Sequence, residues 1–547
     1  MHNTRMILFE RSLSTVRPQP SPTGQNDAAR VIRLELTGPQ SSGVVDTLHY
    51  CLDERSTLVR GSDWWVYAST PVGLDCFPAL TRLLTRGQTD GLDSILEGLE
   101  ELRPVAYVAG CQRRGTLHFG RSLDGFTSLL FGHDNQRLVI SDSRVEVAQR
   151  MGEIRLSQRD KQHCCRNFML EPEGSFYENV KRCFAGVCYH VSARHLAPDQ
   201  RRFMAPASQV RKEADPVQIL TDGLRQLFST YGNRKIALRL SGGADSRVLL
   251  VGLMDAVRQG ILHRDQVLCT GVSFPGFQCD EGAVIHRIVE LSGFESTIIP
   301  ATAELARRAQ QKRMNLPTPP FPTSFIGALC MEEIQRREAS LMLTGHGGDE
   351  VFTFNLSDIL GRSLAQRLRS HDLIRWLRQA RGWRAEAKAL LASALGRHSQ
   401  RGLIQQIKAN QLPADSLAAW RLAYRLTLAQ ACGYENAAAA SHAHGLLLDV
   451  PFFRGPFFPQ LDPARGIHQR RFPYKANAHR YLQAYAPDIA AVPCEKLLFG
   501  DAVDAFFPPP TTAERDAVDT HPAHTYHFAR GYANWSTPFL QTGRNSP

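Results

Sequence analysis

Two glycine-rich loops hold the residues that are best suited to chemistry. The first is SGGADS, residues 241–246, and the second is GHGGDE, residues 345–350. Glycines let backbone N–H groups approach phosphate oxygens, and a helix that begins at such a loop favours a bound anion. Asp245 would repel a bare phosphate, so we interpret it as a ligand of a Mg²⁺ ion that neutralises a polyphosphate. We expect Asp349 to reach the same ion from the second loop.

The elements around these loops predict where they lie in the fold. The apolar stretches with the composition of buried strands are residues 236–240, 266–273, 297–299 and 340–344. Helix-compatible stretches separate them, and one of these runs onward from Arg247. This alternation favours a doubly wound parallel sheet, in which ligands bind at the carboxyl ends of the strands. Val272 and Phe274 lie where one strand ends, so we expect their backbone to meet the adenine of a nucleotide.

The SGGADS loop resembles the pyrophosphate loop of the ATP pyrophosphatases (PP-loop enzymes), which split ATP into AMP and pyrophosphate. It is not a Walker loop, because no Lys-Ser/Thr pair closes it. Together with the GHGGDE loop, it resembles the asparagine synthetase family, whose second loop reads Gly-Glu-Gly-Ser-Asp-Glu. The resemblance implies ATP and Mg²⁺ as cofactors. The alternative is two unrelated glycine turns.

His346 occupies the position of the second loop at which subfamilies of these enzymes differ. Asparagine synthetases have Glu there, and β-lactam synthetases have a Tyr that pairs with a downstream Glu. A His is suited to act as a general base, because its reference pKa of about 6.5 lies near working pH. Glu435 lies at the spacing of that downstream Glu, so the resemblance implies a His346–Glu435 pair. A loop residue next to the Mg²⁺–phosphate and a surface helix residue remain the alternatives.

Two lysines match the last block of the family. Residues 473–501 resemble the family's C-terminal run, in which one Lys begins a helix and a second opens a loop. Lys475 matches the first and Lys496 the second. The resemblance implies that Lys496 stabilises the charged intermediate and the departing pyrophosphate. The candidate catalytic residues are His346, Glu435 and Lys496, the candidate Mg²⁺ ligands are Asp245 and Asp349, and the candidate nucleotide-binding residues are Leu240, Ser241, Gly242, Gly243, Asp245, Ser246, Val272, Phe274, Gly345, Gly347, Asp349 and Lys475.

The N-terminal part of the chain is β-rich and has a different character. Residues 117–143 and 175–191 resemble recurring pieces of class II glutamine amidotransferase domains. Those domains use an N-terminal Cys as the nucleophile, whereas this sequence has His2 and its first Cys is Cys51. We therefore expect a degenerate, Ntn-type β-rich sandwich that no longer releases ammonia from glutamine.

Length and composition limit the remaining possibilities. A chain of 547 residues exceeds one ordinary core, and we place two domains at residues 1–205 and 206–547. No apolar run has the length of a membrane span, no secretory signal is visible, and the 12 cysteines have no zinc spacing. We therefore expect a cytoplasmic protein without membrane insertion.

The net charge of +11 does not by itself identify a partner, because nucleic acid, a membrane surface and an acidic ligand would each fit. No basic motif interleaved with aromatic residues is present, so we expect no nucleic acid. The basic helical stretch at 362–397 is either a solvated face or a surface that receives a peptide or protein partner. The Pro-rich tail after residue 507 carries no recognisable chemistry.

These features predict ATP-dependent amide formation by an α/β protein whose C-terminal domain is a PP-loop sheet with extra helices. The loss of the glutaminase Cys implies an amine other than ammonia, and an intramolecular amine gains most in effective concentration. Of the ring-closing relatives, lasso peptide cyclases fit His346, the chain length and the basic stretch better than β-lactam synthetases do. Such an enzyme joins the N-terminal amine of a core peptide to an Asp or Glu side chain.

The implied partners are a leader-free or leader-bearing precursor peptide and a leader peptidase or recognition protein of the same pathway. Two other readings stay open. One is a β-lactam synthetase-like or asparagine synthetase-like ligase that acts on a small metabolite. The other belongs to a different class, and is a basic RNA-binding PP-loop protein or a silent scaffold.

Overall fold

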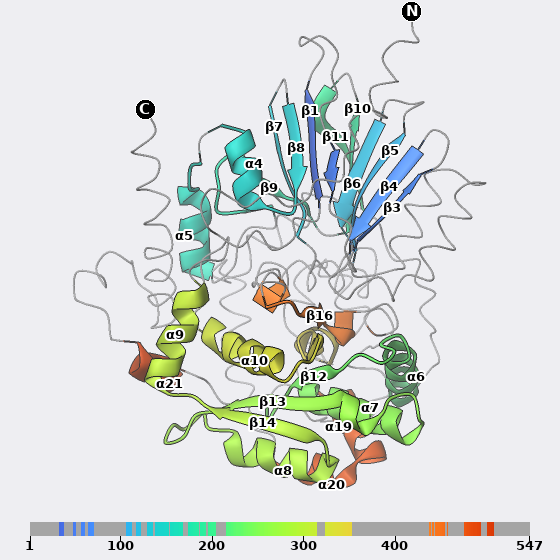
Figure 1. Ribbon diagram of the computed structural model, residues 1–547, viewed down its shortest axis with the longest axis vertical. Coiled ribbons are helices and arrows are strands. Elements are labelled where there is room, and N and C mark those ends of the chain that lie inside the picture. The colour runs from blue at the N-terminus through green and yellow to red at the C-terminus, as the bar shows by residue number, and fades with distance from the viewer. Residues whose placement is uncertain are drawn as a thin grey trace, which may run out of the picture.

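Two antiparallel sheets and one parallel sheet make up the described part of the chain in this computed structural model (Figure 1). The antiparallel sheets come from the N-terminal half and lie above the parallel sheet in that view. The structure describes residues 32–37, 48–50, 56–60, 64–69, 105–111, 116–121, 128–134, 137–152, 154–167, 173–184, 186–192, 195–203, 215–313, 323–352, 437–438, 440–441, 444–453, 457, 475–493 and 500–507.

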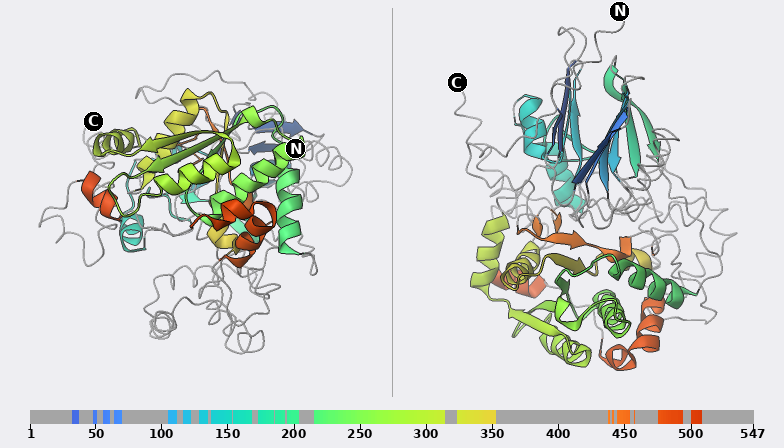
Figure 2. Two further views of the ribbon diagram at one scale, coloured as in Figure 1. Left: turned by 90° about the horizontal axis from the view of Figure 1, so that it is seen from below. Right: turned by 45° about the vertical axis from the view of Figure 1, so that its right-hand side comes forward.

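The N-terminal half is β-rich, as the sequence predicts. Its two sheets have the strand orders β2-β1-β8-β7-β9 and β11-β10-β6-β5-β4-β3. The strands are β1 (Ile32–Thr37), β2 (Leu48–Tyr50), β3 (Ser56–Arg60), β4 (Trp64–Ser69), β5 (Ala106–Cys111), β6 (Thr116–Arg121), β7 (Leu130–His133), β8 (Arg137–Ser141), β9 (Lys181–Arg182), β10 (Val187–Ser192) and β11 (His195–Phe203). The two sheets stand face to face, as the right panel of Figure 2 shows.

Aromatic side chains fill the space between the two antiparallel sheets. The ring centroids of Phe119 on β6 and Phe131 on β7 lie 5.4 Å apart, although the two strands belong to different sheets. Tyr189 on β10 lies 5.1 Å from Phe131. Helix α4 (Arg144–Arg150) covers the outer face of β7 and β8, and α5 (Gln158–Asn167) follows it. This arrangement is a sandwich, whereas its descent from an amidotransferase stays a prediction.

The C-terminal half contains the predicted parallel sheet, with the strand order β14-β13-β12-β15-β16. Its strands are β12 (Ile236–Arg239), β13 (Val267–Ser273), β14 (Glu295–Pro300), β15 (Leu341–Thr344) and β16 (Leu447–Asp449). Its described helices of eight or more residues are α6 (Pro216–Phe228), α7 (Ala244–Arg258), α8 (Gly282–Ser292), α9 (Ala303–Arg313), α10 (Ser324–Arg336) and α19 (Ala476–Tyr485). The shorter helical segments are η2 (Arg264–Gln266), α11 (Gly348–Phe352), η3 (Pro451–Phe453), α20 (Pro487–Ala491) and α21 (Gly500–Phe506).

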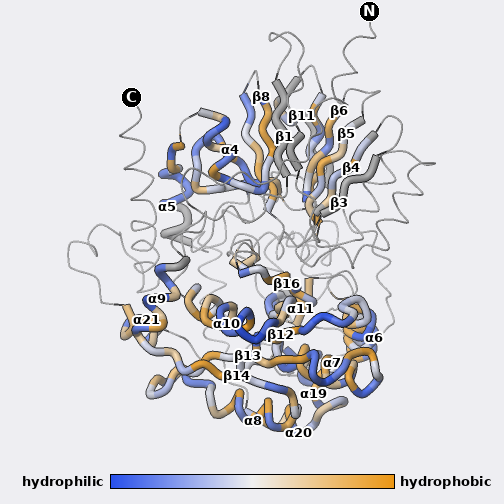
Figure 3. Tube along the Cα trace, viewed as in Figure 1, coloured by the Kyte–Doolittle hydropathy of each residue, from blue (hydrophilic) through white to orange (hydrophobic). Residues whose placement is uncertain are grey.

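The helices divide between the two faces of this sheet. Helices α7 and α8 pack on one face, where α6, α19 and α20 extend the layer, and α10 packs on the other face against β13 and β14. In Figure 1, α10 lies between the sheet and the antiparallel half. Hydrophobic residues recur along β13 and along α7 and α8 (Figure 3), and they belong to one large core cluster. The boundary predicted at residue 205 falls among residues 204–214, outside the described residues, and stays a prediction.

The strand order places a topological switch point between β12 and β15. The chain moves outward from β12 through β13 to β14, and then returns to lay β15 on the other side of β12. In open parallel sheets, ligands bind in the crevice outside the carboxyl ends of the strands at such a point. The SGGADS loop follows β12 and the GHGGDE loop follows β15, so the fold brings both loops to this crevice.

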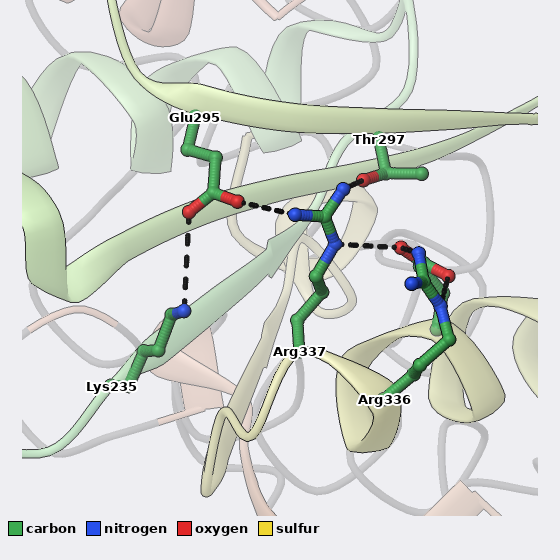
Figure 4. Close-up of polar contacts among 6 residues, drawn as sticks. Lys235, Glu295, Thr297, Arg336 and Arg337 are labelled. Atoms are coloured by element: carbon green, nitrogen blue, oxygen red, sulfur yellow. Dashed lines mark hydrogen bonds and ion pairs between the residues drawn. The ribbon is translucent and has the colours of Figure 1, made fainter.

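The opposite, amino-terminal edge of the sheet carries a network of surface ion pairs (Figure 4). Its members are Lys235, Glu295, Thr297, Glu333, Arg336 and Arg337. Arg337, which follows α10, contacts Glu295 at the start of β14 at 2.8 Å and Glu333 at 3.1 Å. Lys235 reaches Glu295 from just before β12 at 3.9 Å. The network therefore ties the end of α10 to the first residues of two strands.

Among the described residues, no helix combines the length and the apolar composition that crossing a lipid bilayer requires.

Candidate active site

The GHGGDE loop packs directly on the first residues of α7. Helix α7 begins at Ala244, earlier than the sequence suggests, so Asp245 lies in its first turn. A Cβ atom on Gly348 would lie 2.2 Å from the carboxyl carbon of Asp245, and one on Gly345 would lie 2.8 Å from the backbone nitrogen of Ser246. Gly347 has φ +85°, which favours glycine. Gly345 and Gly348 are therefore required by the contact between the two loops, and Gly347 by its own backbone conformation.

Lys475 joins the two loops through their carboxylates. Its ammonium forms an ion pair with Asp245 and lies 2.9 Å from Oδ1 of Asp349. Lys475 precedes α19 with a left-handed backbone, φ 56° and ψ 43°, and is buried. Burial opposes the charge of the ammonium, but Asp245 and Asp349 raise the pKa of Lys475 above its usual value. The two candidate Mg²⁺ ligands thus converge on one cation, Lys475, a contact that the sequence did not predict.

The chemistry of this donor set fits a Mg²⁺–nucleotide. Mg²⁺ is commonly held by one or two carboxylates together with substrate phosphates. Among the described residues, no cluster of three or more His, Cys, Asp or Glu side chains is arranged to hold a metal by itself. The side chain of Asp349 remains 45% exposed, so a ligand can approach it from solvent. We therefore name Asp245 and Asp349 as the residues that would hold Mg²⁺ against the phosphates of ATP.

Serine side chains organise the SGGADS loop from within. The hydroxyl of Ser246 accepts a hydrogen bond from the backbone N–H of Ser241 at 3.1 Å, and the two hydroxyls lie 3.1 Å apart. Ser246 also lies within donating distance of the carbonyls of Ser241 and Gly243, at 3.0 and 3.2 Å. Since Ser246 is buried, its first role is to shape the loop.

The peptide groups of Gly242 are held on both sides by residues that sequence reasoning missed. Its N–H donates to Oε2 of Glu281 at 2.8 Å, and its carbonyl accepts from Arg247 at 2.7 Å. Burial raises the pKa of the Glu281 carboxyl, while the Gly242 bond and Arg247 oppose that rise. The Glu281 carboxylate thus accepts a hydrogen bond from one of the backbone N–H groups that we expected to face phosphate. No local pattern around Glu281 signals this contact, because it spans two separate strand ends.

Arg247 also connects the SGGADS loop to the C-terminal part of the chain. Its guanidinium donates to the carbonyls of Val492 at 2.6 Å and Pro493 at 2.5 Å, and the residue is buried. A buried Arg on the apolar helix directly after the loop is the signal that could have identified it. The loop is therefore fixed to the residues that follow α20.

His346 lies beside the end of β12 and is held by a threonine. Its Nδ1 lies 3.0 Å from the hydroxyl of Thr344. Burial and then the positive charge of Arg239 lower the pKa of His346 to about 3, against a smaller opposing effect of Asp349. The ring is therefore neutral at pH 7 and able to accept a proton. It is, however, a weaker base than its ordinary pKa near 6.5, on which the sequence prediction rested, would make it.

Three of the sequence predictions fall on residues outside the described ranges, and one of them is Glu435, the predicted partner of His346. Glu435 and Lys496 lie outside the described residues, as does the basic stretch at 362–397. The His346–Glu435 pair and the role of Lys496 therefore stay predictions.

The strand end at Phe274 has its own internal bonds. Its N–H donates to Oδ1 of Asp280 at 2.9 Å, and its carbonyl accepts from the N–H of Phe277 at 3.0 Å. Its ring packs against those of Phe325 and Phe506. The geometry therefore does not favour the predicted contact between the Phe274 backbone and adenine. Val272 and Leu240 are also buried in the core.

Most of this arrangement lies in a segment that a family comparison matches. Residues 229–459 match the family model described as asparagine synthase. The match includes the SGGADS loop, the GHGGDE loop and His346. It supports an asparagine synthetase-like segment. No curated protein sequence matches the chain significantly.

Solved structures that resemble the chain do so distantly. One is the U34-tRNA thiolase NcsA from Methanococcus maripaludis, at 13% identity and TM-score 0.24, covering 61% of this chain and 81% of that chain. A second is the NH3-dependent NAD synthetase from Campylobacter jejuni, at 12% identity and TM-score 0.21, covering 40% and 94%. A third is the glutamine phosphoribosylpyrophosphate amidotransferase from B. subtilis, at 9% identity and TM-score 0.20, covering 51% and 86%. The family match, and not these structures, therefore bears on function.

Proposed function

We propose that this protein forms an amide bond at the expense of ATP, and that its substrate is a precursor peptide closed into a macrolactam, as in lasso peptide biosynthesis. The observation that carries the amide-forming part is the convergence of Asp245 and Asp349 on Lys475 at the switch point. It lies within a segment that, apart from Lys475, matches the asparagine synthase family. The peptide substrate rests on the sequence resemblance.

The proposed reaction proceeds in two steps. A carboxylate oxygen of the peptide's Asp or Glu attacks the α-phosphorus of ATP, and pyrophosphate leaves. The N-terminal amine then attacks the activated carbonyl, loses a proton and displaces AMP. Bound Mg²⁺ would neutralise phosphate charge as pyrophosphate departs. The balance is one amide formed and one water equivalent removed from the peptide.

The residues of the chain have separate roles in this scheme. Asp245 and Asp349 hold the Mg²⁺–phosphate assembly, and Lys475 fixes the two carboxylates in place. His346, whose ring is neutral, accepts the proton of the attacking amine. Lys496 offers its positive charge to the developing oxyanion, as the family resemblance implies.

Intact-mass spectrometry tests the proposal directly. The purified protein is incubated with ATP, Mg²⁺ and a candidate precursor peptide encoded next to its gene, and an Asp349→Asn variant serves as the control. We expect a peptide lighter by one water and release of AMP, with neither product in the control. AMP without dehydration of the peptide would move the substrate to a small molecule. ADP in place of AMP would contradict the amide-forming scheme.

A further inference from the structure

Among the described residues, Arg239 has no ionic partner, and it lies beside His346, the proposed base. It is the last residue of β12 and is partly buried. No hydrogen bond or ion pair joins its side chain to any residue that the structure describes. The nearby carboxylates of the site, those of Asp245 and Asp349, are engaged by Lys475 instead.

The parallel register shows which residues surround Arg239. Arg239 is the partner of Thr270 on β13 and of Thr344 on β15, so the three side chains form a row on one face of the sheet. Burial raises the pKa of the Cys330 thiol on α10, and the charge of Arg239 and a hydrogen bond with Thr270 oppose that rise. Cys330 therefore lies near both residues, which places the row on the α10 face of the sheet. Thr344 holds the ring of His346 at 3.0 Å. The row therefore crosses the switch point, where the fold predicts a ligand.

The side chains of the row formed by Arg239, Thr270 and Thr344 are suited to bind an anion. Removing a charge from water is costly unless the charge is paired, and buried charges in proteins are usually paired. The described groups that the register and the electrostatics place next to Arg239 are two hydroxyls, a thiol and a neutral imidazole, and none of these carries a negative charge. Thr270 is fully buried, and its hydroxyl has no hydrogen bond beyond a weak contact with the Cys330 thiol. The missing component is a group that accepts hydrogen bonds and carries negative charge.

We propose that Arg239 binds a carboxylate of the acyl substrate. This inference rests on the proposed function and adds a substrate-binding residue to it. A guanidinium binds a planar carboxylate through two parallel hydrogen bonds, a geometry that an ammonium cannot reproduce. The phosphates of ATP have their own carboxylate-held cation site at Asp245 and Asp349, which leaves Arg239 for the acid.

The proposal has a consequence for His346. The positive charge of Arg239 is the second cause, after burial, of the lowered pKa of His346. A bound carboxylate would offset that charge until adenylation converts it into a neutral acyl group. The pKa of His346 should therefore rise when the acid binds, before the first chemical step.

The first test separates binding of the acid from binding of ATP. AMP formation is measured with the precursor peptide for the wild type and for Arg239→Gln and Arg239→Lys, with Arg337→Gln at the amino-terminal edge as the matched control. We expect Arg239→Gln to raise the KM for the peptide roughly tenfold to a hundredfold. Arg239→Lys should recover part of that loss, and the KM for ATP should stay within about twofold. An unchanged peptide KM, or an equal rise in the KM for ATP, would overturn the proposal.

The second test needs no turnover. Succinate is the probe, and its binding in the presence of Mg²⁺ and α,β-methylene-ATP is followed by saturation-transfer NMR. We expect saturable binding to the wild type and to Arg337→Gln, and none to Arg239→Gln. No succinate binding to the wild type, or equal binding to Arg239→Gln, would contradict the carboxylate site. If succinate does not bind but the nucleotide analogue does in the same sample, the carboxylate site is wrong while the proposed ATP site is retained.

Discussion

The two edges of the parallel sheet carry charged networks of opposite kinds. At the amino-terminal edge, Arg337, Glu295 and Lys235 have side chains that are 35%, 43% and 34% exposed (Figure 4). At the carboxyl edge, the side chain of Lys475 is 8% exposed and serves two carboxylates at once. The cations therefore differ most: Lys475 is largely removed from water, whereas Asp349 stays as open to solvent as Glu295.

This difference separates structural charges from functional ones. Exposed ion pairs contribute little to stability and tolerate replacement. Buried charges cost desolvation energy, and apolar residues of the same volume often stabilise a fold as well or better. A protein that keeps a buried Lys between two Asp side chains at a switch point therefore gains something other than stability. We attribute the gain to a cation and phosphate site.

The largest effect on stability should come from Lys475→Met. This change leaves Asp245 and Asp349 close together without their shared cation, and breaking a buried pair costs about 3–5 kcal/mol. Arg337→Met at the other edge should cost about 1 kcal/mol or less. Urea-induced unfolding of the three proteins measures both values. Added Mg²⁺ should restore more stability to Lys475→Met than it adds to the wild type, and equal losses from the two variants would erase the distinction between the edges.

The largest effect on activity should come from Asp349→Asn. We expect AMP formation to fall about a hundredfold or more, because the variant loses a charge that, in the proposed scheme, would hold Mg²⁺ against the phosphates. Glu295→Gln, an equally conservative change at the amino-terminal edge, should leave the rate unchanged. Phosphorus NMR of the nucleotide products gives both rates. If the two variants were equally impaired, the site would not be confined to the carboxyl edge.

The lowered pKa of His346 predicts that the free energy of unfolding depends on pH, with an effect of intermediate size. Its folded-state pKa of about 3 lies below its unfolded value near 6.5, so the unfolded chain binds more protons between these limits. Stability from this group is therefore full above pH 6.5 and is lost as pH falls toward 3, by at most about 1.4 kcal/mol per pH unit. His346→Gln should flatten the curve of unfolding free energy against pH in that window. Parallel curves for the variant and the wild type would contradict a partly buried ring that stays neutral.

The smallest effect should come from Glu295→Gln on stability. Its ion pairs are exposed, so we expect a loss of about 0.2–1 kcal/mol at low salt that disappears near 1 M salt. Repeating the same salt series with Lys475→Met sharpens the comparison, because a buried pair is screened much less. A loss of stability in Glu295→Gln that does not depend on salt would show that the ion pairs at the amino-terminal edge are also shielded from solvent.

Local patterns predicted the parallel sheet and the position of the two loops. Apolar stretches at residues 236–240 and 340–344 were sufficient to predict β12 and β15, because buried parallel strands read as continuous hydrophobic runs. Motif spacing predicted that Asp245 and Asp349 lie close together, and a family resemblance singled out Lys475 without predicting a contact with them. The structure brings all three side chains together, and their roles stay predictions.

Long-range contacts were beyond the reach of the sequence. Glu281, which precedes α8, reaches Gly242, and Arg247 reaches Pro493 in another part of the chain, so neither contact leaves a periodic signal. The environment of His346 was also unpredictable, because its pKa depends on burial and on Arg239 in a neighbouring strand. The Phe274 prediction relied on a strand end with free backbone groups, and Asp280 and Phe277 engage them.

The most direct test of the account is calorimetric titration with Mg²⁺ and α,β-methylene-ATP, because it requires neither the amine nor the acid. We predict one binding site in the wild type, unchanged affinity in Glu295→Gln, and affinity at least about tenfold weaker in Asp349→Asn, the loss expected from one charge-assisted contact. Equal affinities in all three proteins, or no binding to the wild type, would contradict an ATP site at the carboxyl edge of this sheet.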